Sequence, residues 1–193
     1  MSIRIGNTTI YFGPLIAFLV VIIAVYFISG LSLNISGRKI KKSFETGAYN
    51  KVIKDGERLL KKYQKLAQRY KHKNTIAWIE SLHFVLAVSY FSTMDWDLFL
   101  NHINSMSQYG DTKNFWLSLY YIYHDSLDKA QLYYDNIAKT AENATNISYL
   151  DCLICYKRGN VDSAKTKMND IYSKLKHPIL KHISDELFYK NQI

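Results

Sequence analysis

The sequence predicts an all-α protein in which one N-terminal membrane-spanning helix precedes a stack of helical hairpins. Three observations lead to this prediction. The chain has 193 residues but only 2 Pro and 8 Gly, so long stretches are free of helix breakers. An uncharged run of 24 residues lies near the N-terminus. Beyond this run, apolar residues recur at helical spacing, as in Leu59, Leu60 and Tyr63.

The uncharged run extends from Ile10 to Leu33 and is long enough to cross a bilayer, which takes about 20 apolar helical residues. Tyr11 and Tyr26 lie towards its ends, where aromatic rings favour the membrane interface. A cleaved signal peptide is the alternative. The apolar part of a signal peptide is usually only about 7 to 15 residues long and is followed by an Ala-x-Ala-like cleavage site. Residues 28–30, Ile-Ser-Gly, are a poor match to such a site. We predict an uncleaved transmembrane helix over residues 10–33, preceded by a short extracytoplasmic tail, residues 1–9.

The charges on the two sides of this run predict its orientation. Arg4 precedes it, whereas several basic residues follow closely: Arg38, Lys39, Lys41, Lys42 and Lys51. Positive charge stays on the cytoplasmic side of a membrane. The N-terminus is therefore expected outside the cell membrane and the C-terminal domain in the cytoplasm. The opposite topology, with the domain serving envelope assembly or secretion, is the alternative.

The formal net charge of +9 is concentrated after the apolar run. Residues 38–73 contain 13 Lys and Arg against 3 acidic residues, whereas residues 74–193 contain 11 against 13. Basic residues beside a membrane anchor suit anionic lipid, so the juxtamembrane segment 34–43 is a candidate membrane-surface contact through Arg38, Lys39, Lys41 and Lys42. A solvated face that only sets topology is the alternative. Nucleic acid is disfavoured because no recognised reader motif accompanies the charge.

After a break at residues 43–47, the pattern predicts helices over residues 48–70, 75–91, 95–108, 112–124, 126–141, 145–158, 160–176 and 178–190. Helix-capping residues lie near several of these starts, namely Asp95, Asp111, Asp125, Asn146 and Asn160. The stretch 75–91 is nearly apolar, but Glu80 and His83 interrupt it, so we expect a buried core helix rather than a second span. Residues 44–193 are predicted to form one domain.

A short motif recurs along this domain. Residues 125–130 and 159–164 share a turn residue, an aliphatic residue, Asp and Ala, and the two alanines are 34 positions apart. Residues 47–52 and 93–99 are looser copies. The motif resembles the tetratricopeptide repeat (TPR) family, whose units are helix–turn–helix pairs of about 34 residues. The resemblance implies that repeat packing uses Gly47, Tyr49, Val52, Phe99, Ala130, Tyr134, Gly159 and Ala164.

The chain also departs from the family pattern. The intervals between the four motif positions are 47, 31 and 34 residues, so only the last is regular. Phe99 is large where the family has a small residue. A generic α-helical bundle is therefore the alternative to a TPR-like stack.

Similarity to TPR proteins implies a concave groove that binds a peptide or a helix. Tyr and Trp are frequent anchors in such interfaces. The candidate partner-binding residues are Tyr90, Trp96, Tyr120, Tyr121 and Tyr123, with core packing as the alternative for each. We therefore expect an interaction adaptor or scaffold that docks a protein or peptide partner at the cytoplasmic face of the membrane.

No pattern in the sequence favours catalysis. Cys152 and Cys155 form a C-x-x-C, which is typical of redox or zinc sites, but no second pair of ligands lies nearby. Small cysteines suit positions where helices cross closely, so we expect them to serve packing. The six histidines show no metal-binding spacing, and no glycine-rich phosphate loop is present. We expect no enzymatic activity, metal or cofactor.

Overall fold

The computed structural model describes residues 2–5, 8–11, 35–69 and 73–190. The chain divides into two compact units, Met1–Lys39 and Ile40–Ile193. In the described residues of the second unit all regular structure is helical, which confirms the predicted all-α class for the main domain.

The first unit contains an antiparallel hairpin of β1 (Ser2–Ile5) and β2 (Thr8–Tyr11). Ile5 pairs with Thr8, and the two residues between them are Gly-Asn, a pair that favours tight hairpins. Both strands are rich in Ile and Thr, which favour extended backbone. The predicted transmembrane helix was therefore wrong in its first two residues, Ile10 and Tyr11, which lie in β2. The rest of that predicted span lies outside the described residues.

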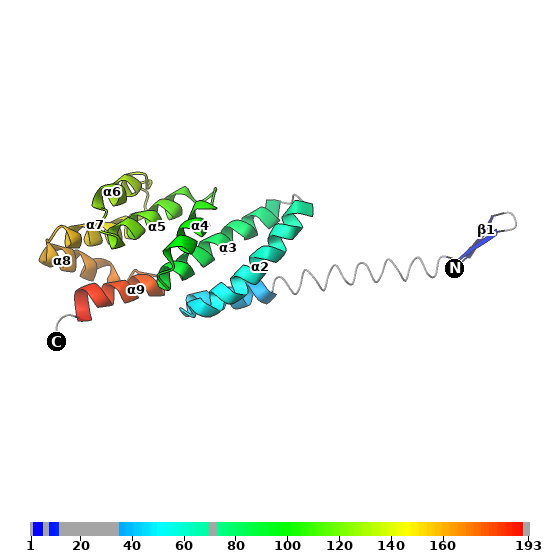
Figure 1. The fold of residues 1–193 in the computed structure, drawn as a ribbon, viewed down its shortest axis with the longest axis horizontal. Coiled ribbons are helices and arrows are strands. Elements are labelled where there is room, and N and C mark those ends of the chain that lie inside the picture. Colours follow the sequence, from blue (N-terminus) through cyan, green and yellow to red (C-terminus); the bar gives the residue numbers. More distant parts are fainter. Residues whose placement is uncertain (1, 6–7, 12–34, 70–72, 191–193) are drawn as a thin grey trace. The chain divides into compact units, whose positions relative to one another are not determined.

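The helical unit is a series of antiparallel pairs (Figure 1). Residues 35–45 are helical, so the predicted break at residues 43–47 was wrong for residues 43–45, and the turn begins at Thr46. They are followed by α2 (Tyr49–Arg69), α3 (Lys73–Ser92), α4 (Trp96–Asn104), α5 (Gly110–Tyr123), α6 (Leu127–Asp135), α7 (Ala144–Lys157), α8 (Val161–Tyr172), α9 (Pro178–Ser184) and a π-helical turn, η1 (Asp185–Tyr189). Four successive hairpins follow: residues 35–45 with α2, then α3/α4, α5/α6 and α7/α8. Helix α2 also packs along α3. Each of the eight helices predicted between residues 48 and 190 has a counterpart in the structure.

Helices α4, α6 and α8 end at Asn104, Asp135 and Tyr172, earlier than predicted. After α4 and α6, carboxylates from other helices bind the chain that follows. After α4, the Ser107 and Gln108 amides donate to the Glu80 carboxylate at 3.0 and 3.4 Å. After α6, the Ala138 amide donates to Asp111 at 3.1 Å. Because these amides bond to side chains, they do not continue the helical ladder.

The predicted capping residues have different roles in the structure. Asp95 caps α4 by accepting from the Leu98 amide, as predicted. Asp125 lies in a turn and binds Lys157 at 2.6 Å. Asn160 is the N-cap residue of α8 without a side-chain bond. Asn146 lies inside the first turn of α7, and the N-cap position there belongs to Asn143.

Four inter-helix turns in the described chain have the same backbone geometry. One residue in each has a positive φ, at +72°, +60°, +53° and +86° in Gly47, Met94, Asp125 and Gly159 respectively. The amide of the next residue bonds to the carbonyl five positions back, as from Ala48 to Ser43 and from Asn160 to Cys155. The positive-φ residue bonds three positions back. This is the Schellman motif that ends a helix, and it occurs at each copy of the sequence motif.

The same register continues into the helix after each turn. Five residues beyond the positive-φ residue stands a side chain that is 0% exposed, namely Val52, Phe99, Ala130 or Ala164. The amides of these four residues form the same helical hydrogen bond to the fourth residue back. The sequence motif therefore marks one structurally equivalent, buried position in four hairpins.

Helix α3 is the central helix of the first half. Residues Asn74–Ser92 are long and apolar enough to cross a membrane by length and composition, and half of this stretch is buried inside the domain. Leu86 and Val88 are fully buried, and α3 packs against both α2 and α4. These contacts agree with the predicted core helix.

Candidate functional site

The C-terminal segment crosses the face formed by the first helices of the hairpins. The His177 ring meets three aromatic rings edge-on, with centroid distances of 4.8, 6.5 and 5.7 Å to Phe44, Phe84 and Trp116. The Tyr149 hydroxyl, from the next first helix, donates to the Leu180 carbonyl at 3.2 Å. One aromatic residue from each of four successive hairpins thus contacts residues 177–180. The face that the TPR resemblance implied would be open is covered by the chain itself.

Burial controls the charge of His177. Its Nδ1 atom is buried and has no hydrogen-bond partner among the described residues. Burial lowers the pKa of His177 to about 4, so the ring is neutral near pH 7. The neutral ring packs as an aromatic side chain between the first helices of the hairpins. A cavity of about 330 Å³ opens beside it, lined in part by Phe115 and Leu175.

Four of the five predicted partner-binding residues lie together at the turn ends of α4 and α5. Trp96 contacts the rings of Tyr120, Tyr123 and His124, at centroid distances of 5.7, 6.1 and 5.0 Å. Tyr121 follows Tyr120 edge-on at 5.1 Å. We call Trp96, Tyr120, Tyr121, Tyr123 and His124 the aromatic turn face. Its rings are half-buried, apart from the exposed His124.

This face continues onto α6. Tyr121 stacks on Tyr133 with centroids 5.5 Å apart and ring planes 6° apart. The Lys129 Nζ atom lies 5.4 Å from the centre of the Tyr121 ring. On the same helix Leu132 is 60% exposed. Stacked rings, a cation and an uncovered aliphatic side chain therefore gather on one accessible surface.

A small cavity of about 100 Å³ lies behind this face, lined by Ile122, Tyr123, Leu153, Tyr156, Lys157 and Leu187. Sites for drug-sized molecules and cofactors usually measure about 300 to 1,000 Å³. This cavity is below that range and suits a single apolar side chain.

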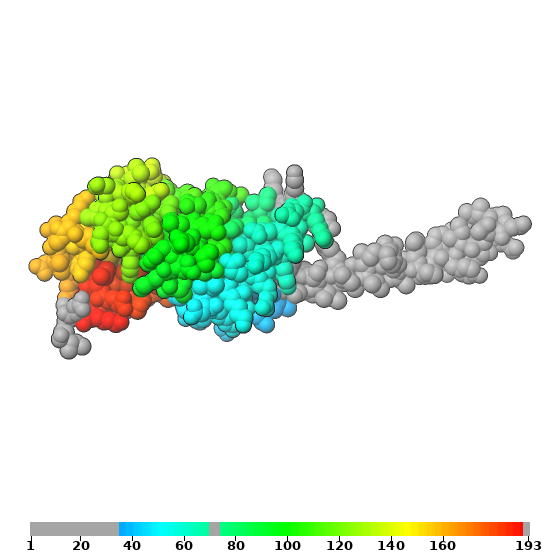
Figure 2. Space-filling view, in the orientation of Figure 1, coloured from blue at the N-terminus to red at the C-terminus, as the bar shows by residue number. Residues whose placement is uncertain are grey.

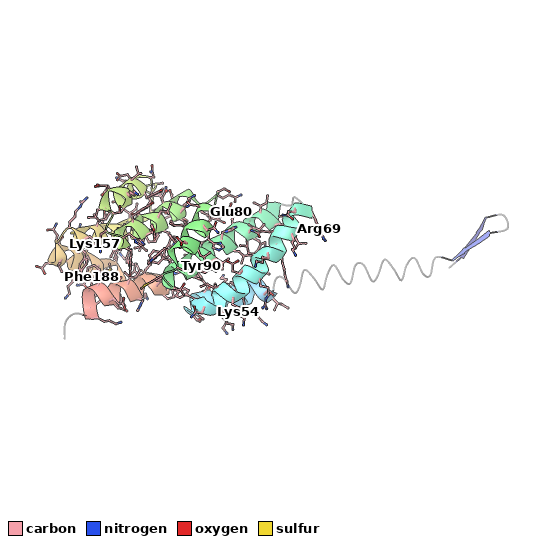
Figure 3. The ribbon with its side chains drawn as sticks, in the orientation of Figure 1. Lys54, Arg69, Glu80, Tyr90, Lys157 and Phe188 are labelled. Atoms are coloured by element: carbon pink, nitrogen blue, oxygen red, sulfur yellow. The ribbon has the colours of Figure 1, made fainter. Side chains whose placement is uncertain are left out.

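Tyr90, the fifth predicted residue and labelled in Figure 3, stacks on His102 of α4, with ring centroids 5.4 Å apart, and bonds to α2. It is only 7% exposed, and its hydroxyl donates to the Glu57 carboxylate at 3.1 Å. Burial and the neighbouring carboxylate raise the pKa of Tyr90 to about 12. The structure places Tyr90 in the packing between helices, and partner binding by all five residues stays a prediction.

The sequence analysis missed a buried polar chain that joins three helices. The Glu57 Oε1 atom of α2 lies 2.9 Å from the His102 Nε2 atom of α4. The His102 and His83 Nδ1 atoms are 2.9 Å apart, which links α4 to α3. Because a carboxylate only accepts hydrogen bonds, His102 Nε2 donates to Glu57. The contact between the two Nδ1 atoms needs one donor and one acceptor, so a single hydrogen lies between them. At most one of the two histidines can therefore be charged at a time.

The protonation of this chain follows from its burial. His83 and His102 are 9% and 5% exposed. Burial and the proximity of His102 lower the pKa of His83. Burial alone would raise the pKa of Glu80, but hydrogen bonds from Ser107 and Gln108 lower it overall. Both histidines are buried, and the geometry of the chain fits a structural link between α2, α3 and α4. The available signal in the sequence was the presence of Glu80 and His83 within an apolar helix.

The two cysteines are unpaired and lie on α7. Cys152 is fully buried, and burial raises the pKa of its thiol to about 11, so the thiol stays protonated. Cys155 is half-buried. Among residues 2–5, 8–11, 35–69 and 73–190, no three His, Cys, Asp or Glu side chains lie close enough together to hold a metal ion. The position of Cys152 agrees with a packing role.

The remaining predicted residues are at the surface or in the core. Arg38, Lys39, Lys41 and Lys42 are all exposed. Lys41 lies 3.9 Å from the Glu45 carboxylate, and no ion pair of the other three is found within the part of the chain that the structure describes. Tyr49 and Tyr134 are half-buried in the hairpins. Comparison with protein-family models, with curated proteins and with solved structures finds no match.

Proposed function

We propose that this protein is a membrane-anchored interaction adaptor whose TPR-like hairpin domain docks a protein partner at the cytoplasmic face of the membrane. The observation that carries the proposal is the aromatic turn face, where four predicted anchor residues gather on one half-exposed surface. Half-exposed Trp and Tyr side chains bury a large area on binding and lose few rotamers.

A TPR-like stack is supported by the four equivalent turns and the four buried positions that follow them. A hairpin cannot bury its apolar side alone, so successive hairpins stack on each other. The first-helix face of this stack is occupied by His177 and Leu180. The partner therefore docks on the turn ends rather than in an open groove.

The chemistry of the surface defines the partner. The Tyr121–Tyr133 stack offers a flat apolar platform, and Lys129 adds a positive charge beside it. The cavity behind Tyr123 takes one apolar side chain. A peptide or helix that carries an apolar anchor next to an acidic residue would satisfy all three features.

The membrane part of the proposal rests on the sequence of residues 12–33 and on the basic residues that follow. Arg38, Lys39, Lys41 and Lys42 would contact anionic headgroups on the cytoplasmic side. A protease-sensitive tag at the C-terminus tests this topology in intact cells. Protection of the tag supports the cytoplasmic domain, whereas cleavage by added protease would establish the extracytoplasmic alternative.

Crosslinking and quantitative affinity isolation from native membranes test partner docking. The full-length protein is compared with a Tyr121→Ser/Tyr133→Ser variant, which removes the stacked platform from partly exposed positions. The matched control is Tyr109→Ser, since Tyr109 is an exposed tyrosine (42%) outside the aromatic turn face.

We expect one specific partner to be reduced about tenfold by the double substitution, as for loss of an aromatic hot spot, and retained by the control. Equal recovery of the same proteins with all three chains would disprove docking through this face. A chain lacking residues 1–33 then separates the roles, because a partner retained by it is recognised by the helical domain alone.

A further inference from the structure

Helix α2 carries a strongly asymmetric charge. All seven of its basic residues are exposed, namely Lys51, Lys54, Arg58, Lys61, Lys62, Lys65 and Arg69. Its two acidic residues, Asp55 and Glu57, are only partly exposed, and Glu57 is bound by His102 and Tyr90. The exposed surface of α2 is therefore strongly cationic, and we call these seven residues the basic stripe.

The stripe is narrow and long. At 3.6 residues per turn, the seven positions fall within about 100° of the helix circumference and extend for about 27 Å. The buried residues of the same helix, including Val52 and Leu60, occupy the opposite side against α3. Figure 3 shows Lys54 and Arg69 at the edge of the domain, towards opposite ends of α2. In Figure 2 the cyan surface of α2 is open to solvent.

The cations of the stripe have no ion-pair partner among the described residues. Within the described part of the chain, no salt bridge joins any of them to a carboxylate, whereas Lys157 and Lys190 each have such a partner. Seven like charges on one helix face repel one another. A surface that supplies negative charge along the whole stripe would relieve that repulsion.

Two exposed apolar side chains lie at the start of α3, next in the chain after the end of the stripe. Ile76 is 42% exposed and Trp78 is 40% exposed. Trp78 stacks on Tyr63 of α2, with centroids 6.0 Å apart and planes 7° apart, which fixes it beside that helix. Tyr63 is a buried residue on the α3-facing side of α2, so Ile76 and Trp78 add exposed apolar area at the α2–α3 edge, outside the stripe itself. Exposed Trp near basic residues is common on surfaces that lie in the membrane interface.

We propose that the basic stripe, together with Ile76 and Trp78, is a docking surface for an anionic lipid bilayer and lays α2 flat on the membrane. This proposal deepens and rests on the proposed membrane anchor. The stripe begins 18 residues after Leu33, the end of the apolar run, so the chain reaches the headgroups. Nucleic acid is the less suitable partner, because no recognised nucleic-acid reader motif accompanies the charge.

Lysine-acetylation footprinting of the full-length protein tests this surface. The protein is reconstituted in nanodiscs of phosphatidylcholine alone or with about 30% phosphatidylglycerol, and the rate at each lysine is read by mass spectrometry. We expect Lys54, Lys61 and Lys65 to react about fivefold more slowly in the anionic discs, and this protection to disappear at about 0.5 M salt. The internal reference lysines are Lys174 and Lys176, exposed and distant in sequence.

A pair of variants with equal charge change gives the control. Lys54→Glu/Arg58→Glu/Lys61→Glu should abolish the protection at Lys65, whereas Lys167→Glu/Lys174→Glu/Lys176→Glu should leave it intact. Equal rates at Lys65 in both lipids would overturn the proposal. Protection by added duplex DNA in zwitterionic discs, with none from phosphatidylglycerol, would overturn it in favour of nucleic acid.

A separate experiment tests the proposed membrane anchor. Alkaline carbonate releases a peripheral protein from native membranes but not one held by a spanning helix. Release would disprove the proposed anchor. The footprint is then repeated with anionic vesicles added to the soluble protein, where unchanged lysine rates would overturn lipid docking by the stripe.

Discussion

The first two hairpins and the last two differ at the same structural position. Five residues after the positive-φ residue, the first two have Val52 and Phe99, whereas the last two have Ala130 and Ala164. All four side chains are completely buried. At Ala130 the small side chain permits close approach, and the Ser118 hydroxyl of α5 donates to the Ala130 carbonyl at 2.9 Å.

The hairpin with the largest of these side chains, Phe99, is packed differently from the two hairpins with alanine. Next to Phe99, His102 of the same helix links α4 to α2 and α3 through Glu57 and His83. The last two hairpins instead bring their helices together around alanines and Cys152. The alanine pair keeps the regular interval of 34 residues, whereas the intervals that involve Phe99 are irregular. We infer that close helix crossings at Ala130 and Ala164 constrain the repeat length, whereas packing around Phe99 and the hydrogen bonds of His102 does not.

The largest effect is expected from Phe99→Ala. Phe99 is 0% exposed and contacts Phe91 and Tyr120, so truncation leaves a cavity. Loss of a buried Phe side chain costs about 3 to 5 kcal/mol. Urea unfolding of the full-length protein, followed by tryptophan fluorescence, measures the change. Leu98→Ala, at a 37% exposed neighbour, should cost under about 1 kcal/mol, and equal losses would contradict the assigned packing.

The second effect depends on pH and concerns His177, which contacts rings from both halves. Its native pKa of about 4 lies below the unfolded value of about 6.5, so the unfolded state binds more protons in acid. Its stabilising contribution is complete above pH 6.5 and is lost as the pH falls from 6.5 to 4. The loss amounts to roughly 3 kcal/mol.

His177→Phe preserves the aromatic contacts and removes the proton site. Unfolding free energies measured from pH 7 to 4.5 should fall less steeply in this variant than in the unaltered protein. The pKa of His83 is also lowered by burial, so some slope remains in both. His182→Gln, at an exposed position of α9, should leave the slope unchanged. An unaltered slope in His177→Phe would contradict burial of that ring.

The third effect concerns the opposite kind of substitution, from a small buried side chain to a large one. Ala130→Leu inserts a larger side chain where α5 and α6 approach closely, and overpacking of this kind costs about 1 to 3 kcal/mol. Ala138→Leu, at an exposed position in the following loop, is the matched control and should be nearly neutral. Chemical unfolding compares the two. Tolerance of Leu at position 130 would show that alanine does not set the spacing of these helices.

The sequence predicted the helices and the four turns because both depend on residues close together in the chain. Each Schellman turn forms within six residues, and its Gly or Asp is visible as a break in the apolar pattern. Helix ends were less predictable, since the end of α4 is set by Glu80, which lies 27 positions from Ser107. Local patterns contain no signal for such bonds.

The closure of the first-helix face and the His83–His102 contact were not predicted for the same reason. His177 meets Phe44 across 133 positions of sequence, and packing over that distance has no periodic signature. The aromatic turn face was partly predictable, because Tyr120, Tyr121 and Tyr123 lie close together on α5 and Trp96 follows a turn. Tyr90 has the same residue type but faces the opposite way, towards Glu57.

The smallest effect concerns the turns that both halves share. Gly159 has φ +86°, and a Cβ atom added there would meet no other atom within 4 Å, so Gly159→Ala introduces backbone strain without a clash. Met94 has φ +60° with a side chain, so Met94→Gly removes such strain. Each change should amount to about 1 kcal/mol, with opposite sign. Thermal unfolding of the two variants tests this symmetry. The opposite result is destabilisation of both variants. It would mean that the Met94 side chain, although 65% exposed, stabilises the fold by more than its strained backbone costs. The two turns would then not be energetically equivalent.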